Sequence, residues 1–147
     1  MSHHPRGRTP RILLIEDNEA DADLVRTAIA RSARPFLLCV APTARKAVAD
    51  VDAAIAGDDV FDLILLDLNL PDRPGLDLLC SLRERTRMGA IFILVLTSSK
   101  APTDREQALL RGASQIMAKH SDWRPFFDGL MSALESHLPT VAGGAAH

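Results

Sequence analysis

Residues 63–71 read "LILLDLNLP": four apolar residues lead straight into Asp67, and Pro71 follows four residues later. Burying an unpaired carboxylate away from water costs several kcal/mol. At the open end of a buried strand, however, the same carboxylate can be held rigidly and still reach solvent. The stretch therefore predicts a buried strand that presents Asp67 at its end, either as a turn residue before Pro71 or as a group with a chemical role.

Apolar runs of strand length alternate with amphipathic segments along the chain. Besides 63–66, the predicted strands are "RILLI" (11–15), "FLLCVA" (36–41), "IFILVL" (91–96) and "SQIMA" (114–118). The predicted helices cover about 19–31, 44–57, 75–86, 103–111 and 122–138. Apolar strands that alternate with helices are typical of a parallel sheet covered by helices on both faces. We therefore expect a doubly wound α/β domain over residues 10–138, with flexible tails at 1–9 and 139–147.

The residues also indicate where the first two helices begin and which way the second one faces. Asn18 and Thr43 are residue types that cap a helix N-terminus. Val48, Val51 and Ile55 recur at helical spacing, so we expect them to form the stripe that packs on the sheet.

Composition and charge restrict the classes of partner. The 147 residues suit one globular domain, with 47% hydrophobic residues and a formal net charge of −2. This weak, interspersed charge gives no reason to expect nucleic acid or a membrane surface as a partner. No apolar stretch approaches the ~20 residues that span a bilayer, and the start "MSHHPRGRTP" does not look like a signal peptide. A cytoplasmic location is the expectation.

Polar residues gather where the predicted strands end. Strand one is followed by Glu16 and Asp17, strand three by Asp67, strand four by "TSS" (97–99) and strand five by Lys119. In open α/β sheets, ligands bind outside the carboxyl ends of the strands. Two unit charges ~4 Å apart repel by about 4 kcal/mol at an effective dielectric of ~20, so a cation should lie among three carboxylates. Oxygen ligands of this kind suit Mg²⁺, which together with Lys119 would balance the charge.

Each of these residues also has an ordinary structural interpretation. An acidic pair after a strand often caps a helix, Thr and Ser form turns, and a lysine is usually a solvated charge. Asp67 alone could be a turn residue. We favour a functional site because all of these residues fall at carboxyl ends of strands in one sheet.

Four motifs carry a resemblance to a known family: "LLIEDN" (13–18), "LILLDLNLPDRPG" (63–75), "VLTSS" (95–99) and "AKH" (118–120). The chain resembles the receiver domains of two-component response regulators, of the chemotaxis CheY type, along nearly all of residues 10–138. The resemblance implies a flavodoxin-like sheet of order 2-1-3-4-5. It also implies that Asp67 accepts a phosphoryl group from a sensor histidine kinase.

The resemblance assigns roles to the other residues of the site. Asp17, Asp67 and the backbone carbonyl of Asn69 would ligate Mg²⁺, and Glu16 would act largely through a bound water. Three further residues would contact the phosphoryl group: Lys119 through its ammonium, Thr97 through its hydroxyl and Ser98 through its amide.

Two positions depart from the family pattern. His120 stands where the family usually has proline after its lysine, so we expect a trans bond and a reshaped loop. Ile116 stands where the family commonly has Tyr or Phe, and the chain contains no tyrosine. The usual switch, in which an aromatic ring follows the movement of the threonine, is therefore in doubt.

The last helix suggests an interaction surface. Apolar residues recur there at three- and four-residue spacing, and they are Trp123, Phe126, Phe127, Leu130, Leu134 and Leu138. Either all of them pack on the sheet, or part of this face forms a homodimer with the fourth helix and fifth strand. The motifs also look similar to small regulators paired with phytochrome-type kinases, including bacteriophytochrome-like ones.

Several functions remain open at this point. The chain could signal by protein contact or act as a phosphate sink, and in either role it is a phosphoacceptor and not an enzyme acting on other substrates. A magnesium-dependent phosphatase of similar fold would have a second aspartate two positions after the first, where this chain has Asn69. A degenerate receiver that binds partners without phosphorylation would not need Glu16, Asp17, Asp67 and Lys119 together.

Overall fold

A computed structural model of the chain describes residues 9–86, 91–98, 101–119 and 123–137. Three parts of the chain for which the sequence makes predictions lie outside these residues: the N-terminal tail except Thr9, His120, and the tail at 139–147. The expectations for those segments, and for the bond between Lys119 and His120, stay predictions.

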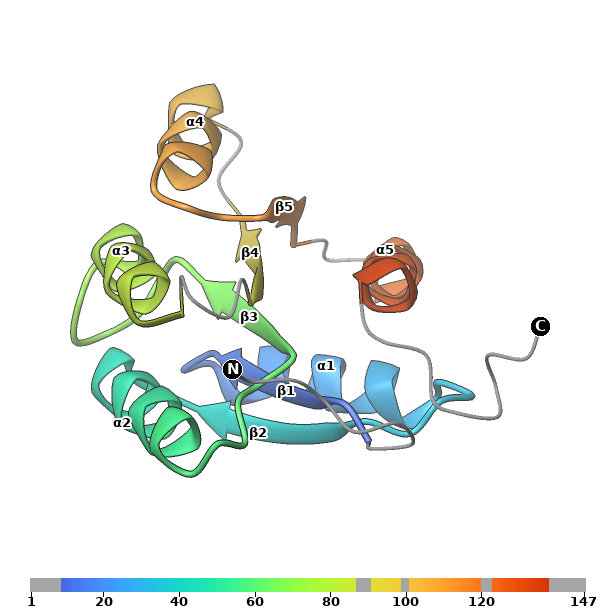
Figure 1. The fold of residues 1–147 in the computed structure, drawn as a ribbon. Helices are drawn as coiled ribbons and strands as arrows, with labels where there is room; N and C mark the ends of the chain where they lie inside the picture. The colour runs from blue at the N-terminus through green and yellow to red at the C-terminus, as the bar shows by residue number, and fades with distance from the viewer. Residues whose placement is uncertain (1–8, 87–90, 99–100, 120–122, 138–147) are drawn as a thin grey trace.

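Five parallel strands form one sheet in the order β2-β1-β3-β4-β5 (Figure 1). The strands are β1 (Arg11–Ile15), β2 (Leu37–Ala41), β3 (Leu63–Asp67), β4 (Phe92–Thr97) and β5 (Gln115–Ala118). The helices are α1 (Glu19–Ala30), α2 (Ala44–Ala56), α3 (Gly75–Thr86), α4 (Pro102–Leu110) and α5 (Trp123–His137). The predicted fold class, the strand order and the alternation of strands with helices are confirmed.

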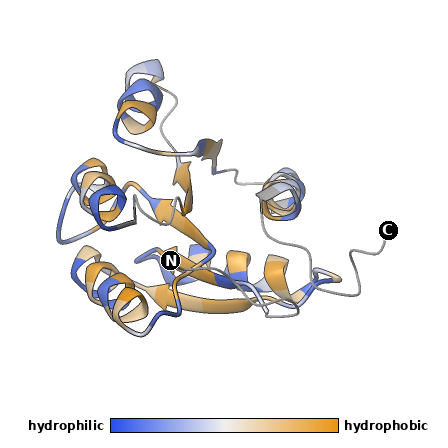
Figure 2. Ribbon diagram, viewed as in Figure 1, coloured by the Kyte–Doolittle hydropathy of each residue, from blue (hydrophilic) through white to orange (hydrophobic). Residues whose placement is uncertain are grey.

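The helices cover the two faces of the sheet as separate layers. α2, α3 and Ala108 of α4 build one core cluster, and α1 and α5 build the other (Figure 1). Successive residues of β1 alternate between the clusters: Leu13 belongs to the first, Leu14 to the second. Figure 2 shows the result, with hydrophobic strands at the centre and helices that are hydrophilic on part of their surface. The middle strands are apolar except at their ends, where Arg11, Asp67 and Thr97 lie, because both of their faces are buried.

The two edge strands are less buried than predicted. Leu37, at the start of β2, is 54% exposed, and only Ala41 of that strand is fully buried. Every residue of β5 is partly exposed. An apolar run was read as a strand buried on both faces, but an edge strand has a neighbour on one side only.

The inner face of α2 also differs from the prediction. Val51 is buried as expected, but Val48 is only partly buried and Ile55 is 40% exposed. The residues that face the core are mostly small, and they are Ala44, Ala47, Val51 and Ala54. Alanines allow the helix to lie close to the sheet, so the buried stripe is rotated relative to the larger side chains that the periodicity favoured.

The predicted helix caps are confirmed, and α2 has a second one. Asn18 Oδ1 accepts a hydrogen bond from the Asp21 N–H at 3.0 Å, and Thr43 Oγ1 accepts one from the Lys46 N–H at 3.1 Å. Asp72 lies in the loop after β3, and its carboxylate accepts from the N–H groups of Ala44 and Arg45 at 2.9 and 3.0 Å. These backbone hydrogen bonds lower the pKa of Asp72. The loop that follows Asp67 is therefore tied to the first turn of α2.

Arg83 of α3 joins that helix to the segments that lead into β4 and β5. Its guanidinium donates to the Gly112 carbonyl from Nε (3.0 Å) and Nη2 (2.7 Å), and from Nη1 to the Ile91 carbonyl (2.7 Å). Gly112 has φ +114°, and a Cβ there would lie 2.9 Å from Arg83 Cγ. The fork geometry of arginine satisfies two carbonyls from separate segments at once.

Candidate functional site

The predicted site residues meet at the carboxyl edge of the sheet because the strands run parallel and in register. Asp67 is the last residue of β3 and pairs with Leu96, so Thr97 lies one residue further along β4. Thr97 in turn pairs with Ala118, which precedes Lys119. On the other side of β3, the N–H of Glu16 donates to the carbonyl of Ala41 (3.1 Å) just after β1 ends.

Three carboxylates form an acidic cluster at this edge. One ligand oxygen from each of Glu16, Asp17 and Asp67 lies within 4.8 Å of the others. Glu16 and Asp67 are each only 2% exposed, whereas Asp17 is exposed. The cluster therefore has a buried floor and an open mouth.

Backbone amides orient the two buried carboxylates. The N–H of Asn69 donates to Asp67 Oδ1 at 3.1 Å, and the N–H of Asn18 donates to Glu16 Oε2 at 3.2 Å. One oxygen of each carboxylate is thus held by the chain that immediately follows it. Lys119 lies near the other oxygen of each.

Lys119 is shared among three carboxylates. Its Nζ lies 3.0 Å from Glu16 Oε1, 3.5 Å from Asp67 Oδ2 and 2.6 Å from Asp21 Oδ2. Its backbone N–H donates to the Thr97 carbonyl at 2.9 Å, which fixes the base of the side chain beside β4. With Asp17 nearby, one ammonium faces four carboxylates, so the site carries excess negative charge.

Burial and neighbouring charges shift the pKa values of two groups in the site, Glu16 and Lys119. Burial raises the pKa of Glu16 to about 7, and two effects of Asp67 add to it: its carboxylate accepts a hydrogen bond from protonated Glu16, and its negative charge repels ionised Glu16. Burial alone would lower the pKa of Lys119, but hydrogen bonds to Asp21 and Glu16 and the charges of Asp67 and Glu16 outweigh it and raise that pKa above its ordinary value. Lys119 is therefore a permanent cation at physiological pH, while Glu16 is close to its titration point.

The donor set of the acidic cluster fits a hard divalent cation. All of its ligand atoms are carboxylate oxygens. Asn69, in the adjoining loop, is exposed and lines the cavity beside the site. Mg²⁺ takes one or two carboxylates and keeps several waters, which the exposed mouth at Asp17 allows. A cation here would offset the negative charge of Asp67, which adds to the effect of burial on the pKa of Glu16.

Thr97 and Ser98 differ in environment although they are adjacent. Thr97 is 3% exposed at the end of β4, and Ser98 is exposed beyond it. Both lie on the edge of the sheet that carries Asp67. Ile116, in the position where the family commonly has an aromatic ring, is partly buried and packs against the α2–α3 core.

The loop from Leu68 to Gly75 closes one side of the site. What requires glycine at position 75 is a close backbone contact. A Cβ at this position would lie 2.5 Å from both Cα and O of Leu68. The Gly75 N–H donates to that same carbonyl at 3.1 Å.

Two residues at or beside the site, Asp21 and Asp72, are not among those predicted from the sequence. Asp21 lies in the first turn of α1, which begins directly after Glu16, Asp17 and the cap residue Asn18. Its closeness in sequence to the acidic pair was a usable signal. Asp72 contacts α2 across 28 residues of sequence, and no local pattern indicates such a contact.

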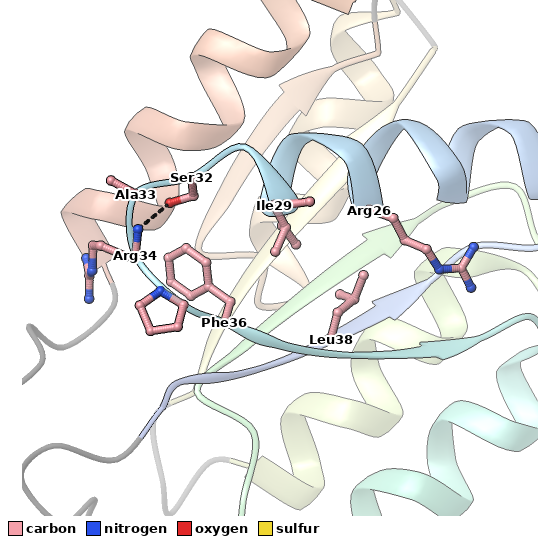
Figure 3. A pocket seen from close by; sticks show the side chains of 9 residues that line it. Arg26, Ile29, Ser32, Ala33, Arg34, Phe36 and Leu38 are labelled. Carbon is pink, nitrogen blue, oxygen red and sulfur yellow. Dashed lines mark hydrogen bonds between the residues drawn. The ribbon is translucent and has the colours of Figure 1, made fainter.

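Two larger cavities are lined by the described residues, one beside the acidic cluster and one away from it. One, of about 690 Å³, is lined by Asp17, by residues 68–76 and by Asp104, and adjoins the site. The other, of about 560 Å³, lies between the end of α1 and the start of β2, as Figure 3 shows with Ile29, Phe36 and Leu38. Leu37 pairs with Arg11, the first residue of β1, so this second cavity is at the amino edge of the sheet, away from Asp67.

The fold and the site define a class of protein: a doubly wound parallel sheet with an acidic pocket and a lysine at its carboxyl edge. A family model described as the response regulator receiver domain matches residues 12–128. The chain belongs to this family, the receiver domains of two-component signalling.

Individual relatives agree with this membership. The phosphorylated cyanobacterial phytochrome response regulator RcpA superposes with a TM-score of 0.80 at 26% identity, covering 90% of this chain and all of that one. The Mn²⁺-bound form of the response regulator Rcp1 gives 0.78 at 26% identity, covering 90% and 97%. The KDP operon transcriptional regulatory protein KdpE of Escherichia coli is 28% identical over 131 residues, or 89% of this chain.

Several curated relatives are longer than this chain. It spans 54% of the length of KdpE and 6% of a hybrid signal transduction histidine kinase of Dictyostelium discoideum. Among the described residues, no helix has both the length and the apolar character needed to cross a membrane.

Proposed function

We propose that the chain is a single-domain response regulator that accepts a phosphoryl group on Asp67 from a histidine kinase in a magnesium-dependent reaction. The observation that carries this proposal is the environment of Asp67. Its carboxylate is buried, oriented by the Asn69 amide and faced by the Lys119 ammonium, and two further carboxylates lie close by. Such a group can react only where its charge is balanced.

In the proposed transfer, an oxygen of Asp67 forms a bond to phosphorus while the phosphorus–nitrogen bond of the kinase phosphohistidine breaks. The bonding electron pair leaves with the imidazole nitrogen. Asp17, Asp67 and the Asn69 carbonyl would hold Mg²⁺, with Glu16 acting through water, and the bound cation would neutralise charge on the phosphoryl oxygens. The proposal that the chain binds a divalent cation is supported by the existence of an Mn²⁺-bound form of the similar regulator Rcp1.

The residues around Asp67 would stabilise the transferred group. Lys119 carries a positive charge into the site, where it can pair with a phosphoryl oxygen. Thr97 would offer its hydroxyl and Ser98 its amide from the end of β4. The same arrangement fits signalling through protein contact and use as a phosphate sink, since both need only the phosphorylated aspartate.

Intact-mass measurement after incubation with acetyl phosphate and Mg²⁺ tests the proposal. We expect one added phosphoryl group on the natural chain, none on Asp67→Asn, and none in EDTA. Asp23→Asn, which removes an exposed carboxylate from α1, is the matched control and should accept the group normally. An adduct that persists in Asp67→Asn would assign the acceptor elsewhere, and a natural chain without any adduct would favour a degenerate receiver.

We also propose that the partner kinase is of the phytochrome type. RcpA, a cyanobacterial phytochrome response regulator, covers 90% of this chain at 26% identity. Phosphotransfer from a panel of purified host histidine kinases tests this, with transfer expected fastest from a phytochrome-type kinase. Faster transfer from an unrelated kinase would contradict it.

We also propose the homodimer that the sequence left open, through α4, β5 and α5, with α4 as its centre. Phe126, Leu130 and Leu134 of α5 are buried against the sheet, so these three side chains are not available to a second copy. On α4, however, Leu109 is 54% and Leu110 79% exposed. We propose that these leucines, with neighbouring parts of β5 and α5, contact a second copy. Light scattering at tens of micromolar should show a dimer that Leu110→Glu disrupts, and a monomer before and after phosphorylation would contradict it.

A further inference from the structure

Lys119 is held more closely by Asp21 than by Asp67. The Nζ–Oδ2 distance is 2.6 Å to Asp21, against 3.5 Å to Asp67, and Glu16 lies between them at 3.0 Å. Charge-assisted hydrogen bonds of 2.6–2.9 Å are strong, whereas a 3.5 Å separation is outside the usual range. The ammonium is therefore displaced from Asp67 toward α1.

The geometry leaves Lys119 able to move. Its backbone is anchored to the Thr97 carbonyl, but the ammonium lies at the end of a flexible four-carbon stem. The Asp21 side chain is 35% exposed, so it lies at the rim of the site, whereas Asp67 is at its floor. Without the contact to Asp21, the Lys119 ammonium would contact only Glu16 and Asp67 of these three carboxylates.

We propose that Asp21 is a positioning residue that holds the Lys119 ammonium away from Asp67 and thereby slows phosphorylation of the chain. This inference rests on the proposed function of Asp67. Transfer requires a negatively charged donor to approach a carboxylate that already lies among other carboxylates. A lysine held at the rim screens that approach less than one placed beside Asp67.

Asp23 provides the matched comparison. It lies on the same helix two residues later, and it pairs with Arg26 at 2.8 Å instead of with Lys119. Asp21→Asn and Asp23→Asn each remove one negative charge from the first half of α1. Only the first removes a charge that contacts Lys119.

The test is the initial rate of adduct formation with acetyl phosphate and Mg²⁺, measured by intact mass. We expect Asp21→Asn to react faster, on the order of fivefold, because the Lys119 ammonium would then lie closer to Asp67 and screen the approach of the donor better. Asp23→Asn should stay within twofold of the natural chain. Asp21→Glu, which keeps the charge, should lie closer to the natural chain than Asp21→Asn does.

A second readout needs neither metal nor phosphate. In EDTA, the side-chain ¹³Cε and ¹⁵Nζ chemical shifts of Lys119 report the surroundings of its ammonium, and we expect both to change in Asp21→Asn but not in Asp23→Asn. Such a difference would show that Asp21 acts on the lysine directly.

The outcomes separate this inference from the proposed function. If the natural chain accepts a phosphoryl group on Asp67 but Asp21→Asn is no faster, the inference is wrong and the function stands. An equal gain in Asp23→Asn also overturns it, since net charge would then explain the rate. If no adduct forms on Asp67 in any variant, the proposed function itself fails.

Discussion

Gly75 shows how one residue type fixes the loop beside Asp67. Its Cα lies so close to Leu68 that any Cβ would meet backbone atoms at 2.5 Å, which a side-chain rotation cannot relieve. We expect Gly75→Ala to lower the free energy of unfolding by about 1–3 kcal/mol, the usual cost of overpacking. Urea denaturation measures it.

Gly57 is the matched control for that substitution. It follows α2 with φ −86°, and a Cβ there would meet its nearest atom, the Ala53 carbonyl oxygen, at 3.4 Å. Gly57→Ala should therefore leave stability unchanged or slightly increase it. Equal losses in both variants would mean that the Leu68 contact is not what requires glycine at 75.

The raised pKa of Glu16 predicts that the stability of the folded chain depends on pH in metal-free buffer. Its pKa is about 7 in the folded chain, against 4.5 as its ordinary value, so the folded chain binds more protons between these pH values. Stability should therefore fall as pH rises from about 5 to about 7, by up to about 3 kcal/mol. Lys119 does not contribute to this change of stability with pH, because its raised pKa means that it stays protonated throughout this pH range.

Denaturation in EDTA between pH 5 and pH 8 checks this dependence. Glu16→Gln should flatten the curve, whereas Glu84→Gln, which alters an exposed carboxylate of α3, should not. A curve of unchanged slope in Glu16→Gln would show that the fall in stability has another source.

At the scale of elements, Arg83 gives a prediction about how α3 is joined to its neighbours. Arg83→Lys keeps the charge but loses the fork that reaches both the Gly112 and Ile91 carbonyls. We expect a loss of about 1.5–3 kcal/mol in the free energy of unfolding, typical of hydrogen bonds to charged groups. Thermal denaturation measures it.

Arg85→Lys, on the same helix, provides the comparison. Arg85 is partly exposed and its ion pair with Asp52 lies at the surface, where such pairs contribute ~0–1 kcal/mol. If the two variants lose stability equally, the buried carbonyl contacts of Arg83 are not the source of its effect.

The positions of the strands and helices were largely predictable from the sequence. Where a prediction about them is wrong, the cause is local. Apolar runs such as 63–66 identify strands because a middle strand is buried on both faces. The inner face of α2 was misjudged because hydrophobic periodicity favours Val48 and Ile55 over the alanines that allow close packing. Burial in β2 was overestimated because a sequence does not show which strands lie at the edge of a sheet.

Residues of the candidate site that stand at strand ends were predictable from the sequence. Residues that join the site through tertiary contacts were not. Glu16, Asp17, Asp67, Thr97 and Lys119 follow from reading what stands after each strand. The contact of Asp21 with Lys119 spans the chain from α1 to the end of β5. Its strength depends on side-chain placement, which no spacing rule supplies.

For the whole molecule, the acidic cluster predicts that Mg²⁺ stabilises the fold. A ligand that binds only the folded state adds RT ln(1 + [L]/Kd), about 2.7 kcal/mol at 100 times its Kd. We expect millimolar Mg²⁺ to raise the melting temperature of the natural chain and to have little effect on Asp17→Asn. Asp23→Asn should keep the full response, and a full response in Asp17→Asn would remove that residue from the metal site.

The edge strand β2 has a consequence for handling the protein. Its residues, "LLCVA", carry no charge, and an open strand edge of this kind can pair with another chain. Pro35 and Pro42 flank the segment, and proline interrupts the ladder of hydrogen bonds that would let such pairing extend. Concentrated samples should therefore self-associate reversibly instead of forming fibrils, and replacing either proline would weaken that protection.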